Sequence, residues 1–206
     1  MVRDGIPFVA IPAVLALILL GFGFWALAII LIALALFMAY FFRDPKRHFV
    51  FEPNVVVAPA DGKITRIAKL DPQDANSPHV ISIFLSVFDV HINRAPIAGR
   101  ITDITYTKGR FLIATREDTS LVNEQNAVTI QGQNMTVVCK QIAGILARRI
   151  VCWKRSGESV ALGEKFGLIK FSSRTDLILP VNVDIAVQVG ARVRGGLTVI
   201  GKLNQS

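Results

Sequence analysis

Two adjacent serines, Ser172 and Ser173, stand where a short apolar run ends, in the stretch FGLIKFSSRTDLILP. Hydroxyls at the end of a strand are common in turns, but a serine hydroxyl also becomes a nucleophile when a nearby base activates it. His91 and Asp61 supply the two other residue types of such a site. A serine, a histidine and an aspartate are together the ingredients of an activated nucleophile.

Each of these residues also has a structural explanation. Asp61 precedes Gly62 between two β-like runs, and Asp-Gly is a favoured hairpin turn. His91 ends a run whose alternate positions change from apolar to polar, which predicts a strand that leaves the core. Ser173 is outside any Gly-x-Ser-x-Gly elbow and no helix is predicted after it, which argues against an α/β-hydrolase. A further alternative is that Ser173 attacks the carbonyl of its own preceding residue.

The elements that must position these residues are predicted to be strands. After Phe42 the sequence is rich in Val, Ile and Thr, in short runs separated by Gly, Pro, Asp and Asn. We expect strand–turn–strand over 54–70, one long strand over 79–96, and further strands within 99–114, 126–143 and 148–157. The predicted fold class is mainly β, a barrel/sandwich hybrid built from hairpins with few short helices.

The N-terminal segment predicts a membrane anchor. No charged residue occurs from Gly5 to Phe42, and nearly every position is apolar. A spanning helix needs about 20 apolar residues, so this run is too long for one straight crossing and far too long for a removable signal peptide. The break at 21–23 predicts a transmembrane hairpin of helices near 8–20 and 24–42. A single long tilted helix and a re-entrant first segment are the alternatives. We expect residues 1–42 to form the anchor and 43–206 the β-rich domain.

The charge of the chain predicts its location. Three cations follow the apolar segment directly, and such cations favour the cytoplasmic side of a membrane (Arg43, Lys46 and Arg47). The formal net charge is +8, and because Arg3 and Asp4 cancel, all of it falls on the β-rich domain. A basic domain beside a bilayer is attracted to anionic headgroups. We therefore expect a protein of the cell membrane with this domain on the cytoplasmic side.

The sequence also limits the expected partners and cofactors. No recognised nucleic-acid motif accompanies the basic charge, so nucleic acid is not an expected partner. Cys139 and Cys152 lack metal-ligand spacing and are expected to be reduced strand or core residues, and no metal is expected. The oligomeric state is left open, and a homo-oligomer is one of the alternatives.

Six segments, taken in order, resemble the phosphatidylserine decarboxylase family, especially its short membrane-anchored form. They are FFRDPKR, VAPADGKI, ISIFLSVFDVHINRAPIAGRI, YTKGRF, NEQN and KFGLIKFSSRTDLILP. Each is weak alone, but their shared order argues against chance. The resemblance runs from about residue 41 to residue 202, so it covers essentially the whole predicted β-rich domain.

The resemblance implies a pyruvoyl-dependent proenzyme. In this family a serine hydroxyl attacks the preceding carbonyl, the chain is cut without hydrolysis, and the serine becomes a pyruvoyl group. Here that serine is Ser173, and the cut at 172/173 gives a larger chain, 1–172, and a smaller chain, 173–206, which stay associated. The implied reaction is the decarboxylation of phosphatidylserine to phosphatidylethanolamine in phospholipid biosynthesis, through a Schiff base between the lipid amine and the pyruvoyl group.

Two positions depart from the family pattern. Ser172 stands where the family usually has glycine, and a cut one residue earlier, at Ser172 itself, is a minor alternative. Arg94 stands where longer relatives have a second histidine that assists self-cleavage. His91 and Asp61 are then the expected acid–base pair, with Asp61 orienting the imidazole, and Arg94 is a candidate for the headgroup phosphate. The competing function is a membrane-anchored serine hydrolase that uses Ser173, His91 and Asp61 without self-cleavage.

Overall fold

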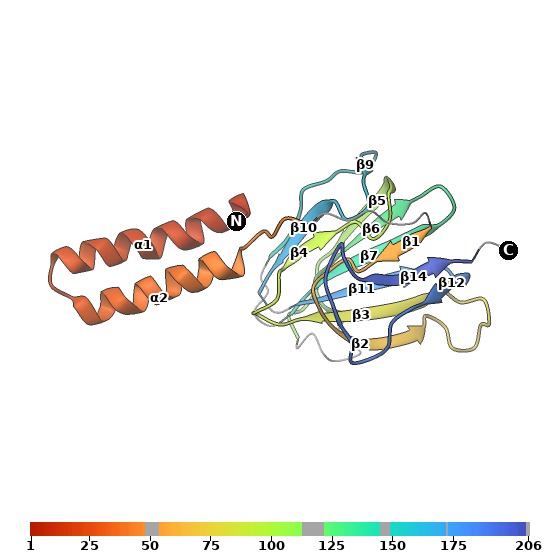
Figure 1. Ribbon diagram of the computed structural model, residues 1–206, viewed down its shortest axis with the longest axis horizontal. Coiled ribbons are helices and arrows are strands. Elements are labelled where there is room, and N and C mark those ends of the chain that lie inside the picture. Colours follow the sequence, from red (N-terminus) through yellow and green to blue (C-terminus); the bar gives the residue numbers. More distant parts are fainter. Residues whose placement is uncertain (48–53, 113–121, 145–148, 172, 205–206) are drawn as a thin grey trace. The chain divides into compact units, whose positions relative to one another are not determined.

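The computed structural model of the protein describes residues 1–47, 54–112, 122–144, 149–171 and 173–204 (Figure 1). The chain divides into two compact units, Met1–Lys46 and Arg47–Ser206. The first unit is helical and the second is built from strands, as the change in composition after Phe42 predicts. The boundary in the structure lies four residues beyond the predicted one.

The first unit is a helical hairpin. A short 3-10 turn, η1 (Arg3–Gly5), leads into α1 (Ile6–Gly21), and α2 (Trp25–Phe41) returns beside it (Figure 1). Gly23 has φ +80° in the connecting turn, a left-handed conformation that glycine adopts without a steric penalty. The predicted hairpin is therefore confirmed over the single long helix.

The hairpin has the character of a membrane segment. Arg3–Gly21 spans 19 residues with a mean hydropathy of 2.1, which is long and apolar enough to cross a bilayer, whereas Trp25–Phe41 is shorter. Large apolar side chains point outward all around it: Leu17 is 68% exposed and Leu36 is 66% exposed. Three small residues are buried instead (Ala16, Ala28 and Ala35). Small residues allow helices to approach closely in lipid, where no hydrophobic effect drives them together.

The described residues of the second unit form fourteen strands in three antiparallel sheets. The largest sheet has the order β13-β2-β3-β11-β7-β6-β5-β9, and the smaller two are β1-β14-β12 and β4-β10-β8. The strands are β1 (Val55–Val57), β2 (Gly62–Lys69), β3 (His79–Leu85), β4 (Ile92–Arg94), β5 (Gly99–Thr107), β6 (Gln125–Gln131), β7 (Thr136–Ala143), β8 (Arg149–Cys152), β9 (Ser159–Val160), β10 (Lys165–Lys170), β11 (Ser173–Leu179), β12 (Val183–Ile185), β13 (Arg192–Val193) and β14 (Val199–Leu203).

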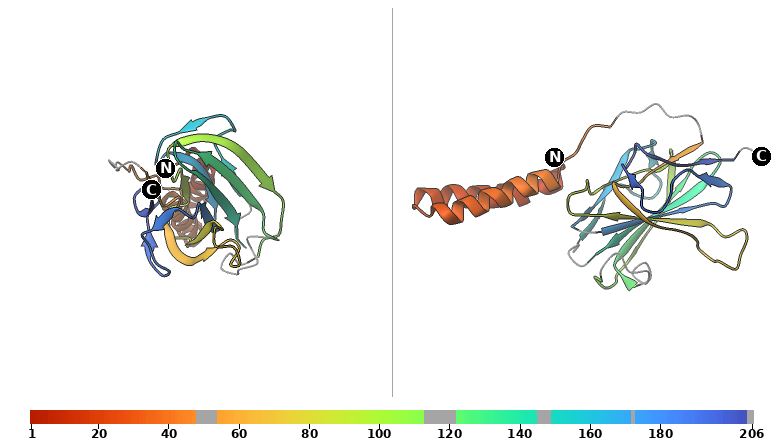
Figure 2. Two further views of the ribbon diagram at one scale, coloured as in Figure 1. Left: turned by 90° about the vertical axis from the view of Figure 1, so that its right-hand side faces the viewer. Right: turned by 60° about the horizontal axis from the view of Figure 1, so that its bottom comes forward.

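The core lies between the large sheet and the two small ones. The large sheet curls, so that one of its faces encloses the interior (Figure 2). Alternate residues of β3 supply that face: Ile81, Ile83 and Leu85 are fully buried, as period-2 alternation requires. Phe166 of β10 and Ile200 of β14 close the same cluster from the small sheets. The predicted β-rich fold is confirmed.

The expected hairpin at Asp61-Gly62 is wrong in its pairing. Strands β1 and β2 both form, but β1 pairs with β14 whereas β2 pairs with β3 and β13. The segment between them is a corner that carries the chain from one sheet to another. Gly62 is required there because a Cβ at this position would lie 2.1 Å from the carbonyl oxygen of Phe84.

The expected long strand over 79–96 is also wrong, because a turn at Ser86–Asp89 divides it. The Ser86 backbone N–H donates to Asp89 Oδ2 (2.8 Å), and the Asp89 N–H donates to the Ser86 carbonyl (3.0 Å). Local side-chain-to-backbone bonds of this kind compete with strand pairing. His91 therefore follows a turn and leads into β4 of a different sheet, rather than ending β3.

Candidate active site

Ser173 is the first residue of β11, the strand that lies between β3 and β7 in the large sheet. It pairs with Leu85 on one side and with Ala143 on the other. Its side chain is fully buried, and among the described residues its hydroxyl has no hydrogen-bond partner. A buried hydroxyl without a partner loses free energy relative to water, about 1–3 kcal/mol. A buried polar group without a partner requires an explanation, and a role in chemistry is one such explanation.

The backbone just before Ser173 adopts a strained conformation. Phe171 has φ +63°, in the left-handed region that aromatic residues rarely adopt. Strain of this kind costs about 1–3 kcal/mol and clusters at functional sites. Ser172, the other residue of the predicted cut, lies outside the described residues. The strain therefore adjoins the peptide bond that the sequence predicts to break.

His91 is fully buried between the Ser86–Asp89 turn and β4. Its Nδ1 lies 3.0 Å from the carbonyl oxygen of Asp89, and because a carbonyl only accepts, Nδ1 carries the hydrogen. In the neutral imidazole the other ring nitrogen, Nε2, then holds the lone pair. The backbone of Asp89 thus fixes the tautomer in which Nε2 is able to accept a proton.

Two of the described hydrogen bonds relate the segment of His91 to that of Ser173. Asn93 Nδ2 donates to Thr175 Oγ1 (2.9 Å), and both residues are fully buried. His91 lies two residues from Asn93, and Ser173 lies two residues from Thr175, toward the same end of the sheets. The Ile169 N–H also donates to the His91 carbonyl (3.2 Å), so His91 lies beside the end of β10, the strand that leads to Ser173.

The Asn93–Thr175 contact belongs to a chain of buried amides. Gln141 Nε2 donates to Asn93 Oδ1 (2.9 Å), and Asn126 Nδ2 donates to Gln141 Oε1 (2.9 Å). Gln141 is fully buried, and Asn126 is 3% exposed. This network joins β4 to β6, β7 and β11, and it meets β11 at Thr175, two residues from the buried serine. Fully satisfied buried networks favour one arrangement of the elements they join.

Asp61 lies in the corner before β2, where an arginine and a backbone amide hold its carboxylate. Arg47 donates to both oxygens (2.6 and 2.8 Å), and the Gly195 N–H donates to Oδ1 (2.8 Å). Arg47 also donates to the Gly195 carbonyl. Among the contacts that the structure describes, the imidazole of His91 is not a partner of Asp61. The described contact of the imidazole is that of Nδ1 with the carbonyl of Asp89, and the orienting role of Asp61 stays a prediction.

Arg94, the candidate phosphate contact, is 6% exposed. Its guanidinium donates to the Gly163 carbonyl oxygen (3.0 Å). Gly196 has φ +71°, and a Cβ there would lie 2.8 Å from Arg94 Cδ, so glycine allows the arginine stem to pass. These contacts favour a structural role in joining the 163 and 196 turns, and the phosphate role stays a prediction.

The pKa values of both cysteine thiols are raised in the structure. Burial raises the pKa of the Cys139 thiol, and the nearby Asp176 carboxylate raises it further. Burial also raises the pKa of Cys152, although its backbone contact to Lys154 acts in the opposite direction. Both shifts reduce the thiolate fraction near neutral pH, so neither cysteine is prepared to act as a nucleophile.

Reasoning from the sequence named the serine and the histidine, whose roles stay predictions, but missed most of the residues that position them. Gln141 carried no signal as an isolated polar residue in a β-rich stretch, Thr175 carried none beyond its place in KFGLIKFSSRTDLILP, and Arg47 was interpreted only as a cation beside the apolar segment. Arg47 and Asn126 do lie within FFRDPKR and NEQN, two of the segments on which the family resemblance depends. The site therefore contains the buried hydroxyl of Ser173, the His91 imidazole in a defined tautomer, and a strained backbone at Phe171, two residues before Ser173.

Comparison with known proteins confirms the family resemblance that these segments indicate. The sequence model of the phosphatidylserine decarboxylase family matches residues 34–201. A phosphatidylserine decarboxylase proenzyme of Solibacter usitatus (strain Ellin6076) is 51% identical over 175 residues, covering 85% of this chain and 83% of the relative. The proenzyme of the same name from Burkholderia multivorans (strain ATCC 17616 / 249) is 42% identical, covering 98% of this chain and 96% of its own. That of Desulfotalea psychrophila (strain LSv54 / DSM 12343) is 40% identical over 98% of this chain.

Proposed function

Since the chain belongs to the phosphatidylserine decarboxylase family, we propose that it converts itself into that enzyme by cutting its own backbone before Ser173. The enzyme removes the carboxylate of the serine headgroup of phosphatidylserine and leaves phosphatidylethanolamine. The relatives are named proenzymes, which agrees with a precursor that must be processed. The single observation that carries the proposal is the fully buried Ser173 hydroxyl, which has no partner among the described residues.

The cut requires no external nucleophile. Ser173 Oγ adds to the carbonyl carbon of residue 172, its proton passes to a base, and the C–N bond breaks to leave an ester. Loss of the α-hydrogen of residue 173 then expels the residue 172 carboxylate and leaves a dehydroalanine. Addition of water to its tautomer releases ammonia and leaves a pyruvoyl group at the head of the chain 173–206. Water and ammonia balance this final exchange.

The described residues support this sequence of steps. The strain at Phe171 raises the energy of the uncut chain and is relieved when the backbone is released. His91 has Nδ1–H committed to the Asp89 carbonyl, so Nε2 is the atom that accepts the serine proton. Serine at 172, in place of the glycine usual in the family, adds a side chain next to the attacked carbonyl. We therefore expect slower processing here than with glycine.

In the mature site the protein residues then have two tasks: they position the substrate, and they return a proton to the carbon that loses CO2. A pyruvoyl group supplies a carbonyl that condenses with an amine and accepts the electrons released when CO2 leaves. His91 Nε2 is our candidate for returning a proton to the carbon that loses CO2. Asp61 as its acid–base partner and Arg94 as a phosphate contact remain predictions. The Arg47 and Gly195 contacts of Asp61 favour a role in holding the 195 turn.

We place the enzyme at the cell membrane with its β-rich unit on the cytoplasmic side. At the end of α2 the Arg43 guanidinium lies 3.9 Å from the centre of the Tyr40 ring and donates to the Tyr40 carbonyl (2.9 Å). Aromatic residues and cations are enriched at the ends of spanning helices, and cations favour the cytoplasmic end. An anchored enzyme also leaves the acyl chains of its lipid substrate within the bilayer, where exposing each CH2 to water would cost about 0.8 kcal/mol.

Intact-mass spectrometry of the purified chain tests the proposal. We expect two chains that part between residues 172 and 173, the smaller with a blocked N-terminus that reacts with carbonyl reagents. The Ser173→Ala variant should stay uncut and inactive, while Ser172→Gly, the matched change at the neighbouring serine, should be processed faster. An active enzyme with residues 172 and 173 still joined, labelled by a serine-reactive phosphonate, would establish the hydrolase mechanism instead.

A further inference from the structure

The turn that precedes the site histidine exposes an aromatic ring. Phe88 is 63% exposed, although the residues on either side of it form hydrogen bonds within the turn. The Phe88 N–H lies 3.4 Å from Ser86 Oγ, and Asp89 bonds to Ser86 through both its backbone and its carboxylate. Asp89 also pairs with Arg192 (3.3 Å). The ring is therefore held outward by a fixed turn three residues before His91.

A second apolar group lies at the same end of the large sheet. Phe111 is 39% exposed and Val122 is 38% exposed, on the chain that follows β5 and precedes β6. β5 ends at Thr107, which pairs with Gln125, and Gln125 pairs with Ile142, one residue before the partner of Ser173. The register of the strands thus brings the described ends of this connection, 108–112 and 122–124, to the Ser173 end.

Three exposed cations lie at the same end of the strands. Lys108 and Arg110 are exposed on the chain after β5. Arg149 is exposed at the start of β8, where it is the strand partner of Lys170 at the same end. We call Phe88, Phe111, Val122, Lys108, Arg110 and Arg149 the basic aromatic face. Acidic groups at this end are largely neutralised among the described residues: Asp61 pairs with Arg47 and Asp89 with Arg192. Glu124, which is partly buried, is the third described acid there.

We propose that the basic aromatic face binds the surface of an anionic phospholipid bilayer, with Phe88 inserted at the level of the headgroups. Aromatic rings partition to this interface, and cations are attracted to anionic lipid. A protein bound to this face would cover the end of the sheet where Ser173 lies, so the lipid substrate would have to approach Ser173 from another side. A bilayer partner presents the substrate at the end of the sheet where Ser173 lies. The inference rests in this respect on the proposed function.

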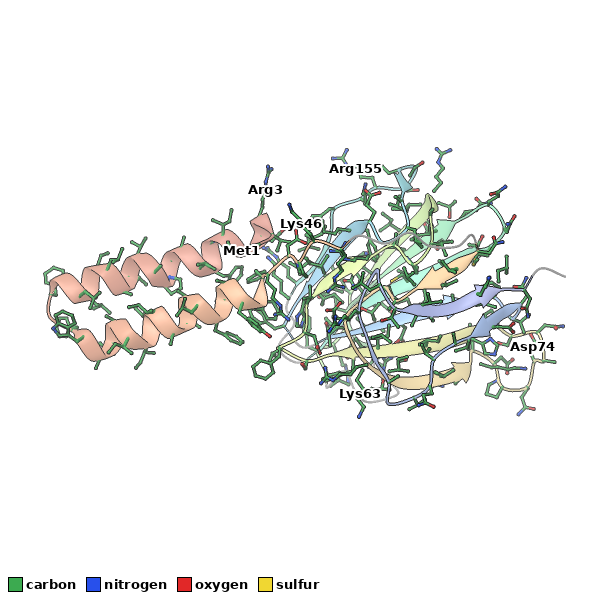
Figure 3. The ribbon with its side chains drawn as sticks, in the orientation of Figure 1. Met1, Arg3, Lys46, Lys63, Asp74 and Arg155 are labelled. Atoms are coloured by element: carbon green, nitrogen blue, oxygen red, sulfur yellow. The ribbon has the colours of Figure 1, made fainter. Side chains whose placement is uncertain are left out.

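The opposite end of the sheet offers a matched control. Leu70 is 58% exposed in the β2–β3 connection, which is close to the exposure of Phe88. Figure 3 shows Lys63 near the beginning of β2 and Asp74 in the β2–β3 connection, at opposite ends of this strand pair. Lys63 pairs with Phe84, one residue before the partner of Ser173, so Leu70 lies at the end remote from the site.

The test uses the full chain in nanodiscs of phosphatidylserine and phosphatidylcholine with brominated acyl chains. The Phe88→Trp and Leu70→Trp variants are compared with the parent, which corrects for Trp25 and Trp153. We expect brominated lipid to quench the added emission of Phe88→Trp and not that of Leu70→Trp. Quenching of both variants by aqueous acrylamide alone would overturn the proposal.

A second measurement gives the functional consequence. Phe88→Ser should lower kcat/KM for phosphatidylserine in vesicles about tenfold or more relative to kcat/KM for a dispersed short-chain phosphatidylserine, whereas Leu70→Ser should leave this ratio unchanged. An equal ratio in both variants would refute the proposal. Intact mass is recorded for the same samples. If brominated lipid quenches Phe88→Trp but the chain is uncut, membrane binding by the basic aromatic face is supported and self-cleavage before Ser173 is refuted. If the chain is cut but brominated lipid does not quench Phe88→Trp, self-cleavage is supported and membrane binding by this face is refuted.

Discussion

The buried amide chain behind Ser173 gives the sharpest test of what holds the two sides of the site together. Gln141 accepts from Asn126 and donates to Asn93, and its Nε2 lies 3.4 Å from the Val151 carbonyl. The Gln141→Leu substitution keeps a side chain of similar size and removes all of these bonds. It leaves the Asn126 amide and the Asn93 carbonyl inside the protein without the partner that satisfied them.

The expected cost follows from the two stranded groups. A buried polar group that loses its partner costs about 1–3 kcal/mol, so two give about 2–6 kcal/mol in the free energy of unfolding. Both groups are more than nine-tenths buried, since Asn93 is 0% and Asn126 is 3% exposed, so water cannot replace the lost bonds cheaply. A loss of this size is a large fraction of the stability of an ordinary domain.

The measurement is denaturant unfolding of the full chain in detergent, followed by circular dichroism. All variants carry Ser173→Ala, so that one uncut chain unfolds in each case. Gln125→Leu is the matched control, because among the described residues Gln125 Oε1 has no hydrogen-bond partner, and we expect a change within about 0.5 kcal/mol. If Gln141→Leu and Gln125→Leu change the stability equally, the amide chain does not hold these strands together.

Three further perturbations test other parts of the structure. Phe171→Gly should relieve the φ +63° strain and slow self-cleavage several-fold, measured by the time course of intact mass; an unchanged rate would show that the strain is not used. Arg47→Met, in the uncut background, should lower the free energy of unfolding by about 3 kcal/mol in denaturant, because the largely buried Asp61 loses its counter-ion; a loss below about 1 kcal/mol would contradict this. Burial raises the thiol pKa of Cys139 and Cys152, so iodoacetamide followed by mass spectrometry should show slow labelling at neutral pH, with the half-buried Cys152 labelled first; rapid labelling of Cys139 at pH 7 would refute the burial argument.

The fold class could be predicted because its signals are local. Apolar runs of spanning length and alternating strands with turn residues are patterns within a few neighbouring positions. The sheet to which each strand belongs is decided by contacts between distant residues. The sequence of β1, the Asp61-Gly62 corner and β2 fits a hairpin equally well, and only the pairing of β1 with β14 shows otherwise.

The candidate site divides in the same way. Ser173 and His91 could be named because their residue types carry chemistry and their segments match a family pattern. The contact that orients His91 could not, because it comes from the backbone of Asp89, and every residue has a carbonyl. Nor could Gln141 be found, since its importance depends on Asn93 and Asn126, which lie 48 and 15 residues away in sequence.

The place of Ser173 at the head of a central strand has a consequence for the life of the molecule. Beyond the proposed cut, β11 lies between β3 and β7, β14 pairs with β1, and β13 pairs with β2, so the short fragment is woven through two sheets. Before the cut, folding is a unimolecular event. After it, recovery from denaturation becomes an encounter between two separate polypeptides that depends on their concentration. The assembled enzyme would then persist through the slowness of its unfolding, and a molecule that once came apart in a dilute membrane would not be restored.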